Sequence, residues 1–224
     1  MFQIEQLSII VITGVLCVLI YWLGRSVKKL TLEKTPSGIA LLSVLYVKTF
    51  IDFTVDNMGK KHGYKMSAYI GSAFLYILVS NISGLFGLEA PTSNYSVTLA
   101  LALITWVLIQ GTKIRENGVA GYLKGFFKPF FLFVIPNVFS TIAPLISLSL
   151  RMFGNVLSGA FIMSLLYSVT GWLSGFVPVI GGINFIAVVI TPWLHLYFDL
   201  FSGFLQAFLF ISLTTIFIAI EYND

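Results

Sequence analysis

The longest apolar stretch of this 224-residue chain reads FFKPFFLFVIPNVFSTIAPLISLSLRMFGNVLSGAFIMSLLYSVT, residues 126–170. As one straight α-helix at about 1.5 Å per residue it would be about 68 Å long, whereas the hydrocarbon core of a bilayer is about 30 Å thick. A second apolar stretch, Ile183–Ile220, would be about 57 Å long by the same measure. In a membrane these two segments have to tilt strongly, bend, or run partly along an interface.

The composition indicates an integral membrane protein. Hydrophobic residues make up 58% of the sequence and charged residues 10%, and the mean hydropathy is +0.95. A soluble domain is about one quarter charged, and α-helices satisfy their own backbone hydrogen bonds in lipid. Cys17 is the only cysteine. Because it lies in an apolar run, we interpret it as a small buried hydrophobic residue, and a single cysteine excludes an intramolecular disulfide.

The motifs of soluble-substrate chemistry are missing from the sequence. It contains no Walker loop, no cluster of metal-ligand residues, no nucleophile elbow and no Rossmann glycine pattern. We therefore predict that the chain is not an enzyme by itself, needs no cofactor or metal, and binds no nucleic acid.

Five apolar segments follow one another along the chain. They are Leu7–Leu23, Tyr64–Leu88, Tyr95–Gln110, Phe126–Thr170 and Ile183–Ile220. Between the first two, Lys48, Asp52 and Asp56 recur at every fourth position and apolar residues take the other side, which is typical of an amphipathic helix on a membrane surface. We predict an all-α integral membrane protein in one polytopic domain, residues 1–224, with five transmembrane helices plus a membrane-surface helix.

The basic residues predict the orientation, because lysine and arginine concentrate in cytoplasmic loops. Twelve of the thirteen lie between the first and second segments or between the third and fourth: Arg25, Lys28, Lys29, Lys34, Lys48, Lys60, Lys61, Lys65, Lys113, Arg115, Lys124 and Lys128. The connections FGLEAPTSN (86–94) and GWLSGFVPVIGGIN (171–184) contain none. We predict an outer N-terminus and a cytoplasmic C-terminus. The first helix is retained, because Glu5 precedes it and basic residues follow it.

An alternative splits 126–170 into two spans with Arg151 near an outer turn. Two observations oppose it. The sequence around Arg151 has no convincing turn dipeptide, and a sixth crossing would place the C-terminus outside.

Arg151 is the thirteenth basic residue, and the predicted topology does not place it in a cytoplasmic connection. It lies 23 residues after Lys128 and 48 before Asp199, the nearest charges on either side. On a regular helix Asn155, Ser147 and Ser158 share with it a wedge of about 80°, at about 100° per residue. In the last segment His195, Asp199, Ser202 and Gln206 span only about 60°.

These two polar stripes admit a structural and a functional interpretation. In the structural one, the stripes satisfy each other across a helix pair, with Arg151 and Asp199 as the ion pair. In the functional one, they mark an ion or proton pathway, because a charge in mid-membrane costs about 2.5–3.5 kcal/mol even on the lenient scale. We favour the functional one. Arg151 stays protonated, which suits repelling cations or attracting a carboxylate, whereas Asp199 and His195 can titrate. Asn81 and Ser83 are weaker candidates for a polar cavity lining, and hydrogen bonding between helices explains them equally well.

Three stretches of the sequence resemble one family. SLSLRMFGNVLSG (147–159) is similar to the signature of subunit a of F-type ATP synthases, the membrane stator that faces the rotating c-ring. NISGLFGLEAPTSNYSVTLALAL (81–103) and FLQAFLFISLT (204–214) resemble the family's other two recognisable stretches, in the expected order. The resemblance covers residues 64–221. It implies an N-terminal span and surface helix in 1–63, and in 64–224 an ion-translocating core that ends in a long, steeply tilted hairpin.

The resemblance also assigns roles. Arg151 matches the essential arginine, which acts as an electrostatic switch. Asn155 and Gln206 match the family's asparagine and glutamine, and Asp199 stands where members carry an acid or a histidine. The implied lining of two aqueous half-channels is then Asn155, His195, Asp199, Ser202, Gln206 and Ser147, with Asn81, Ser83 and Asn94 as further candidates.

Two positions depart from the family pattern. Nine residues after the arginine, where many members carry glutamate or histidine, this chain has Ala160. In the outer loop, Asn94 and Ser96 replace the usual acid and asparagine. Both departures weaken waypoints of the outer half-channel.

The resemblance implies a stator subunit of the Fo sector that translocates H⁺ or Na⁺ and works with the c-ring, the peripheral-stalk b subunits and the whole F1Fo complex in a bacterial plasma membrane. The rival hypotheses are a self-contained cation channel or secondary transporter with Arg151 and Asp199 paired as a gate, and a purely structural membrane subunit.

Overall fold

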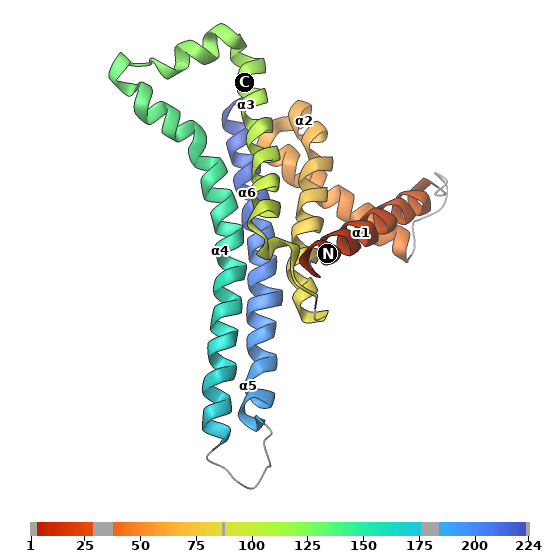
Figure 1. The fold of residues 1–224 in the computed structure, drawn as a ribbon. Helices are drawn as coiled ribbons and strands as arrows, with labels where there is room; N and C mark the ends of the chain where they lie inside the picture. The colour runs from red at the N-terminus through yellow and green to blue at the C-terminus, as the bar shows by residue number, and fades with distance from the viewer. Residues whose placement is uncertain (1–3, 29–37, 87, 176–183, 223–224) are drawn as a thin grey trace.

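A computed structural model describes residues 4–28, 38–86, 88–175 and 184–222 (Figure 1). Within these ranges all regular structure is helical, so the predicted all-α class is confirmed. The elements are α1 (Ile4–Lys28), α2 (Ile39–Ile82), η1 (Ser83–Phe86), η2 (Pro91–Ser93), α3 (Tyr95–Phe126), η3 (Phe131–Phe133), α4 (Val134–Ser174), α5 (Phe185–His195), η5 (Leu196–Phe201) and α6 (Ser202–Ile220). The predicted outer connection at 176–183 and the basic residues Lys29 and Lys34 lie outside the described residues.

A long hairpin dominates the fold. α4 runs without a break for 41 residues, and α5, η5 and α6 continue one another alongside it (Figure 1). Arg151 lies inside α4, so the alternative that split 126–170 at an outer turn is wrong. Pro144 is accommodated inside α4 and Pro192 inside α5.

Four helices of the described chain are long and apolar enough to cross a membrane, namely Ile39–Phe86, Tyr95–Phe126, Phe131–Ser174 and Ile186–Ile220. This confirms a multi-pass membrane protein. The apolar part of α1, Gln6–Trp22, is shorter than these, and α1 lies across the direction of the long helices (Figure 1). The predicted count of five spans plus a surface helix therefore stays a prediction.

A sharp bend at Gly59 divides α2 into two arms. Its φ of 73° lies in the left-handed region that favours glycine. Beyond the bend the chain passes so close to the first arm that a Cβ on Gly63 would lie 2.6 Å from Val55 Cα, and Thr54 Oγ1 donates to Gly63 O at 3.0 Å. Along the first arm the predicted stripe, Lys48, Asp52 and Asp56, is exposed. The pattern read as a surface helix thus forms a separate arm of α2.

The main core lies where α2, α3, α4 and α6 meet. Its buried members are Phe50, Ile70, Ala73, Ile77, Ala102, Leu148, Met152, Ala207, Phe210 and Ile211. Leu148 and Met152 are each only 1% exposed. On a regular helix at about 100° per residue they lie about 60° and 100° around α4 from Arg151, which is exposed beside this buried face.

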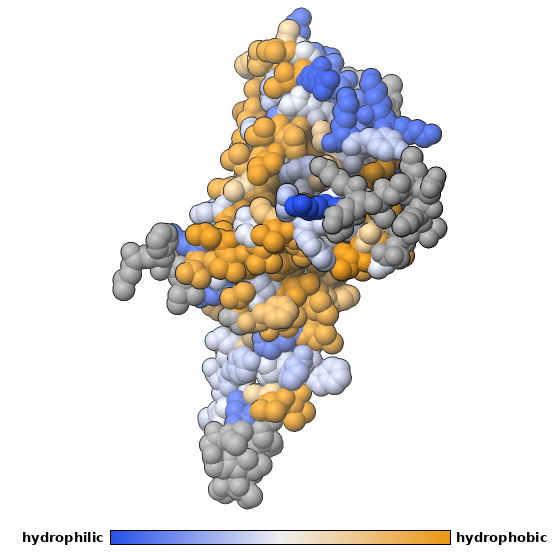
Figure 2. Space-filling model, turned by 90° about the vertical axis from the view of Figure 1, so that its right-hand side faces the viewer, coloured by the Kyte–Doolittle hydropathy of each residue, from blue (hydrophilic) through white to orange (hydrophobic). Residues whose placement is uncertain are grey.

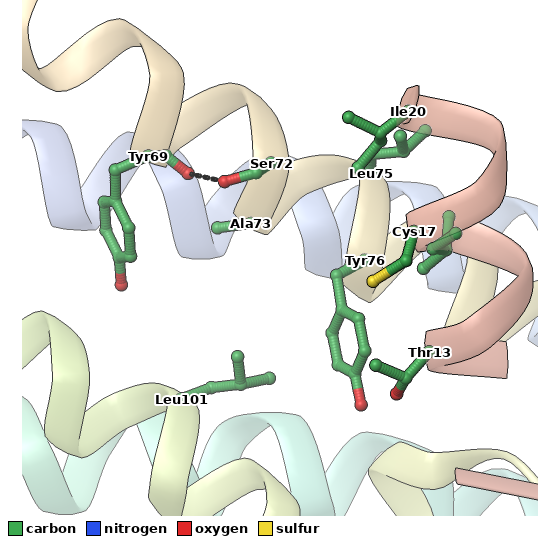
Figure 3. A pocket seen from close by; sticks show the side chains of 10 residues that line it. Thr13, Cys17, Ile20, Tyr69, Ser72, Ala73, Leu75, Tyr76 and Leu101 are labelled. Atoms are coloured by element: carbon green, nitrogen blue, oxygen red, sulfur yellow. Dashed lines mark hydrogen bonds between the residues drawn. The ribbon is translucent and has the colours of Figure 1, made fainter. Parts of the chain in front are cut away.

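The N-terminal helix covers only part of α2 and α3. A cavity of about 220 Å³ remains between them, and Figure 3 shows Thr13 and Cys17 of α1 facing Tyr76 of α2 across it. Cys17 is exposed, which corrects the interpretation of a buried residue. The reason is that α1 buries a different stripe, with Leu16 at 4% exposure, and Cys17 lies at its edge.

The two basic connections and the C-terminal end of α6 meet at one end of the molecule. Lys113 Nζ of α3 lies 3.1 Å from Glu221 Oε1, and the rings of His62 and Tyr222 stack with centroids 3.7 Å apart. Figure 2 shows hydrophilic atoms gathered toward this end and hydrophobic atoms over the middle of the same face. The structure therefore places these segments on one side, as the predicted topology requires.

Candidate functional site

Arg151 projects from the uncovered face of α4. Its side chain is exposed, and its Nη2 donates to Ser147 Oγ, one turn earlier, at 3.4 Å. Exposed apolar residues surround it on the same helix, with Leu150 at 51% and Leu157 at 38%. Only 6% of the apolar window of α4 is buried, against 44% for that of the last helix. A cation on such a face costs free energy in a membrane unless a counter-charge meets it.

Arg151 and Asp199 do not form an ion pair. Within the described ranges the ion pairs are Lys113–Glu221 and His195–Asp199, and in the second His195 Nδ1 lies 2.6 Å from Asp199 Oδ2. The structural interpretation, in which Asp199 neutralises Arg151 across the hairpin, is thus not realised. The arginine remains without a carboxylate partner in the part of the chain that is described.

Asp199 lies in a π-helical turn. Leu196–Phe201 forms η5, between α5 and α6, and wider turns of this kind occur frequently at functional sites. The side chains of His195 and Asp199 keep 35% and 24% of their surface accessible, so neither is fully covered by the described chain. The helical wheel assumes a regular helix, and the π turn changes the angular spacing between these residues. The predicted neighbours His195 and Asp199 nevertheless come together.

The next polar pair bridges the two arms of the hairpin. Ser202 Oγ donates to Asn155 Oδ1 at 3.0 Å, so the predicted stripes of α4 and of the last helix meet here. One turn further, Gln206 is 5% exposed and its Nε2 has no hydrogen-bond partner. A buried amide without a partner costs free energy, and sites of this kind often serve function.

Three of the predicted residues have structural contacts. Asn81 is buried, donates from Nδ2 to Gly203 O at 3.2 Å and accepts from Thr92 Oγ1 at 2.7 Å, which ties α2, η2 and α6 together. Ser83 Oγ donates to Ser80 O at 2.7 Å. Asn94 caps α3, accepting from the backbone N–H of Ser96 at 2.9 Å. These contacts hold the elements around the site together, and a part for these residues in the lining stays a prediction.

The sequence analysis missed Tyr167. Its hydroxyl lies 3.2 Å from His195 Nε2, so it joins the predicted stripe from the opposite arm of the hairpin. A tyrosine in an apolar run is usually interpreted as an aromatic residue at the membrane interface. The residues next to Tyr167 in the sequence give no sign of a functional role. The antiparallel register of the hairpin would have revealed it, because Tyr167 and His195 lie at similar distances from the connection at 176–183.

The arrangement offers an exposed permanent cation on an apolar face and a partly wetted line of polar groups behind it. Among the residues that the structure describes, no three His, Cys, Asp or Glu side chains gather as a metal site would require. Such a site can attract a carboxylate and can hold or move a proton.

Comparisons with known proteins give one consistent result. The family described as ATP synthase A chain matches residues 7–219. The chain is 34% identical over 226 residues to the ATP synthase subunit a of Mycoplasmoides gallisepticum, covering 92% of this chain and 74% of that protein. It is 33% identical over 198 residues to the sodium ion specific ATP synthase subunit a of Propionigenium modestum, covering 80% of this chain but 63% of that protein. A third relative, the ATP synthase subunit a of Desulforamulus reducens, is 36% identical over 165 residues, with 73% and 60% covered.

Proposed function

Because this chain belongs to the family of subunit a of F-type ATP synthases, we propose that it supplies two aqueous half-channels to a rotating ring of c-subunits, with Arg151 as the electrostatic switch between them. The family is a membrane component of the Fo sector, so its contribution to ATP synthesis is ion transport. The observation that carries the proposal is the exposed Arg151 on an uncovered apolar face, with no carboxylate of the described chain beside it.

The proposed partner of Arg151 is a carboxylate on the ring. A guanidinium remains charged under all physiological conditions, so it attracts an ionised carboxylate and repels the bound cation. The cation is thereby released into the inner half-channel, and the charge of Arg151 prevents it from leaking directly between the two channels. The exposed apolar residues of α4 around Arg151 provide the surface along which the ring slides.

The proposed outer half-channel follows the last helix. His195, Asp199, Ser202 and Gln206, with Asn155 opposite, offer the ion polar groups in sequence from the hairpin turn toward Arg151. An ion entering there loads onto the ring carboxylate, and the neutralised site then turns into lipid. Each unit charge that crosses yields about 2.3 kcal/mol per 100 mV, which the rest of the complex converts into ATP.

The proposed setting is a bacterial plasma membrane. The relatives named above are bacterial proteins, and the meeting of the basic connections with the end of α6 supports a cytoplasmic C-terminus by the positive-inside rule. We propose the peripheral-stalk b subunits and the whole F1Fo complex as further partners, and a single polytopic domain in which 1–63 flank an ion-translocating core, 64–224.

Two measurements separate this stator from a self-contained channel. The first is mass spectrometry of the intact detergent-extracted complex, which we expect to contain a ring of small hairpin subunits. The second is the conductance of the purified chain in liposomes, which we expect to be absent without the ring. A chain that conducts ions alone would favour the channel hypothesis, and an intact complex without a ring would refute the stator.

A further inference from the structure

Three side chains form a continuous hydrogen-bonded line across the hairpin. Tyr167 of α4 reaches His195 Nε2 at 3.2 Å, and His195 Nδ1 reaches Asp199 Oδ2 at 2.6 Å. Both nitrogens of the imidazole are therefore engaged, one toward each arm. An imidazole held at both nitrogens is arranged to receive a proton on one side and to give one up on the other.

The hydrogen positions follow from the chemistry of the end groups. An ionised carboxylate only accepts, so the Nδ1 of His195 carries the hydrogen that is donated to Asp199. In the neutral ring Nε2 is then an acceptor, and it accepts from the hydroxyl of Tyr167. Every donor in the line thus points from Tyr167 toward Asp199, which is the direction from the hairpin turn toward Arg151.

Accessibility falls along the same line. Tyr167 is 44% exposed as a residue, and the side chains of His195 and Asp199 retain 35% and 24% of their surfaces. Tyr167 lies about 24 Å along α4 from Arg151, at about 1.5 Å per residue, toward the connection at 176–183. The line therefore begins at an exposed side chain near the hairpin turn and ends at the less accessible carboxylate of Asp199.

From this geometry we propose that Tyr167, His195 and Asp199 form a proton relay at the entrance of the outer half-channel, and that the coupling ion of this chain is consequently H⁺. The inference rests on the proposed stator function and adds to it the identity of the ion and a role for Tyr167.

The transfer balances without any other reactant. Water delivers one proton to the Tyr167 oxygen while the hydroxyl proton passes to His195 Nε2, forming an imidazolium. The imidazolium then releases its Nδ1 proton to Asp199 Oδ2. One proton has entered and one has reached the carboxylate, and the ring is neutral again with its hydrogen on Nε2. Loss of the Nε2 proton to water and uptake of one proton from water at Nδ1 of the partly exposed ring restore the starting tautomer, with no net change in protons.

The same line is unsuited to Na⁺. Hard cations bind several oxygen ligands, whereas the central member here is an imidazole, which suits other metals. Both of its nitrogens are occupied by hydrogen bonds. A sodium ion would have to break both hydrogen bonds in order to pass, and a proton uses them.

The ion can be tested on the complete ATP synthase containing this chain, reconstituted into liposomes. We expect a pH gradient without added Na⁺ to drive ATP synthesis, and a Na⁺ gradient without a pH gradient to drive none. Synthesis driven only by Na⁺ would overturn the relay and leave the stator function standing. Synthesis driven by neither gradient, in a complex that still hydrolyses ATP, would instead overturn the stator function.

The relay can be tested by passive proton flux through the membrane sector after removal of F1. Tyr167→Phe removes one hydroxyl, and we expect it to lower the flux about a hundredfold, the lower end of the range for a lost proton-transfer group. Tyr197→Phe is the matched control, because Tyr197 is an exposed tyrosine of η5 whose hydroxyl has no hydrogen bond to the described chain. Equal flux in the two variants, at equal membrane abundance, would contradict the relay.

A second variant distinguishes transfer from packing. His195→Ala should lower the flux about a hundredfold, and added imidazole should restore part of it, because a free imidazole can carry the proton across the gap. Imidazole should not restore Tyr167→Phe, in which the ring is still present. If His195→Ala reaches the membrane and its lost flux does not respond to imidazole, the relay is wrong. If the protein does not accumulate, the comparison of Tyr167→Phe with Tyr197→Phe decides.

Discussion

Asp199→Asn separates a carboxylate that passes ions from one that locks the hairpin. Asn keeps an oxygen that can accept from His195 Nδ1 and has nearly the same size. What is lost is the negative charge of Asp199. Its ion-pair partner among the described residues is His195, whose Nδ1 lies 2.6 Å from Asp199 Oδ2 and whose side chain is 35% accessible. A partly exposed pair of this kind contributes about 0–1 kcal/mol. Removing the partner of a buried arginine would cost about 3–5 kcal/mol.

Because Arg151 makes no ion pair with Asp199, we expect the smaller figure. Asp199→Asn should therefore accumulate in the membrane like the unaltered protein, while its ion flux falls about a hundredfold, as expected for the loss of a proton-transfer group. The assay is an immunoblot of membrane abundance together with passive flux and gradient-driven ATP synthesis. Asp52→Asn is the matched control, because Asp52 is an exposed acid in the first arm of α2, far along the chain from His195 and Asp199.

The outcome that would refute this reasoning is loss of the protein from the membrane in Asp199→Asn, with recovery of abundance when Arg151→Ala is added. That pattern would show that the two residues compensate each other. We expect the double variant to match Asp199→Asn in abundance and to remain inactive.

Two further predictions concern the contact between α2 and α6 and the membrane topology. Gly203→Ala should lower membrane abundance, because its Cβ would lie 2.9 Å from Asn81 Cβ and such overpacking costs about 1–3 kcal/mol. Gly111→Ala is the control, since its Cβ would meet nothing within 4 Å, and equal abundance of the two variants would contradict the contact between α2 and α6. In a background without Cys17, single cysteines that react with an impermeant thiol reagent report which side of the membrane they face. We expect labelling from outside at positions 93 and 174, in place of Ser93 and Ser174, and from the cytoplasmic side in place of Asn117 and Asn223. Labelling from outside at the Asn223 position would contradict the predicted orientation.

The sequence alone was sufficient to predict the membrane class and the long hairpin, because the apolar runs exceed the thickness of a bilayer. It also brought together the right polar residues. His195 meets Asp199, and Ser202 meets Asn155, because polar groups on facing helices in an apolar setting have few other partners.

Other features depend on tertiary structure that a helical wheel does not contain. The π turn at Leu196–Phe201 is one, since the wheel assumes a constant angle per residue. Tyr167 is another, because its role comes from the register of the hairpin. For Asn81 the sequence left open a cavity lining or a hydrogen bond between helices, and the hydrogen bond to Gly203, more than a hundred residues later, comes only from the tertiary structure. The exposure of Cys17 likewise depends on which face of α1 packs against the neighbouring helices.

The switch role of Arg151 is tested most directly by ion-driven ATP synthesis in the assembled complex carrying Arg151→Ala, compared with Arg115→Ala, the same change at an exposed arginine of α3. We predict that the Arg151→Ala complex assembles normally and makes no ATP from an imposed gradient. Arg151→Lys should lose most of its ATP synthesis, because a compact ammonium lacks the planar, delocalised charge of a guanidinium. Arg115→Ala should synthesise ATP at the normal rate. Near-normal synthesis by an assembled Arg151→Ala complex would contradict the account.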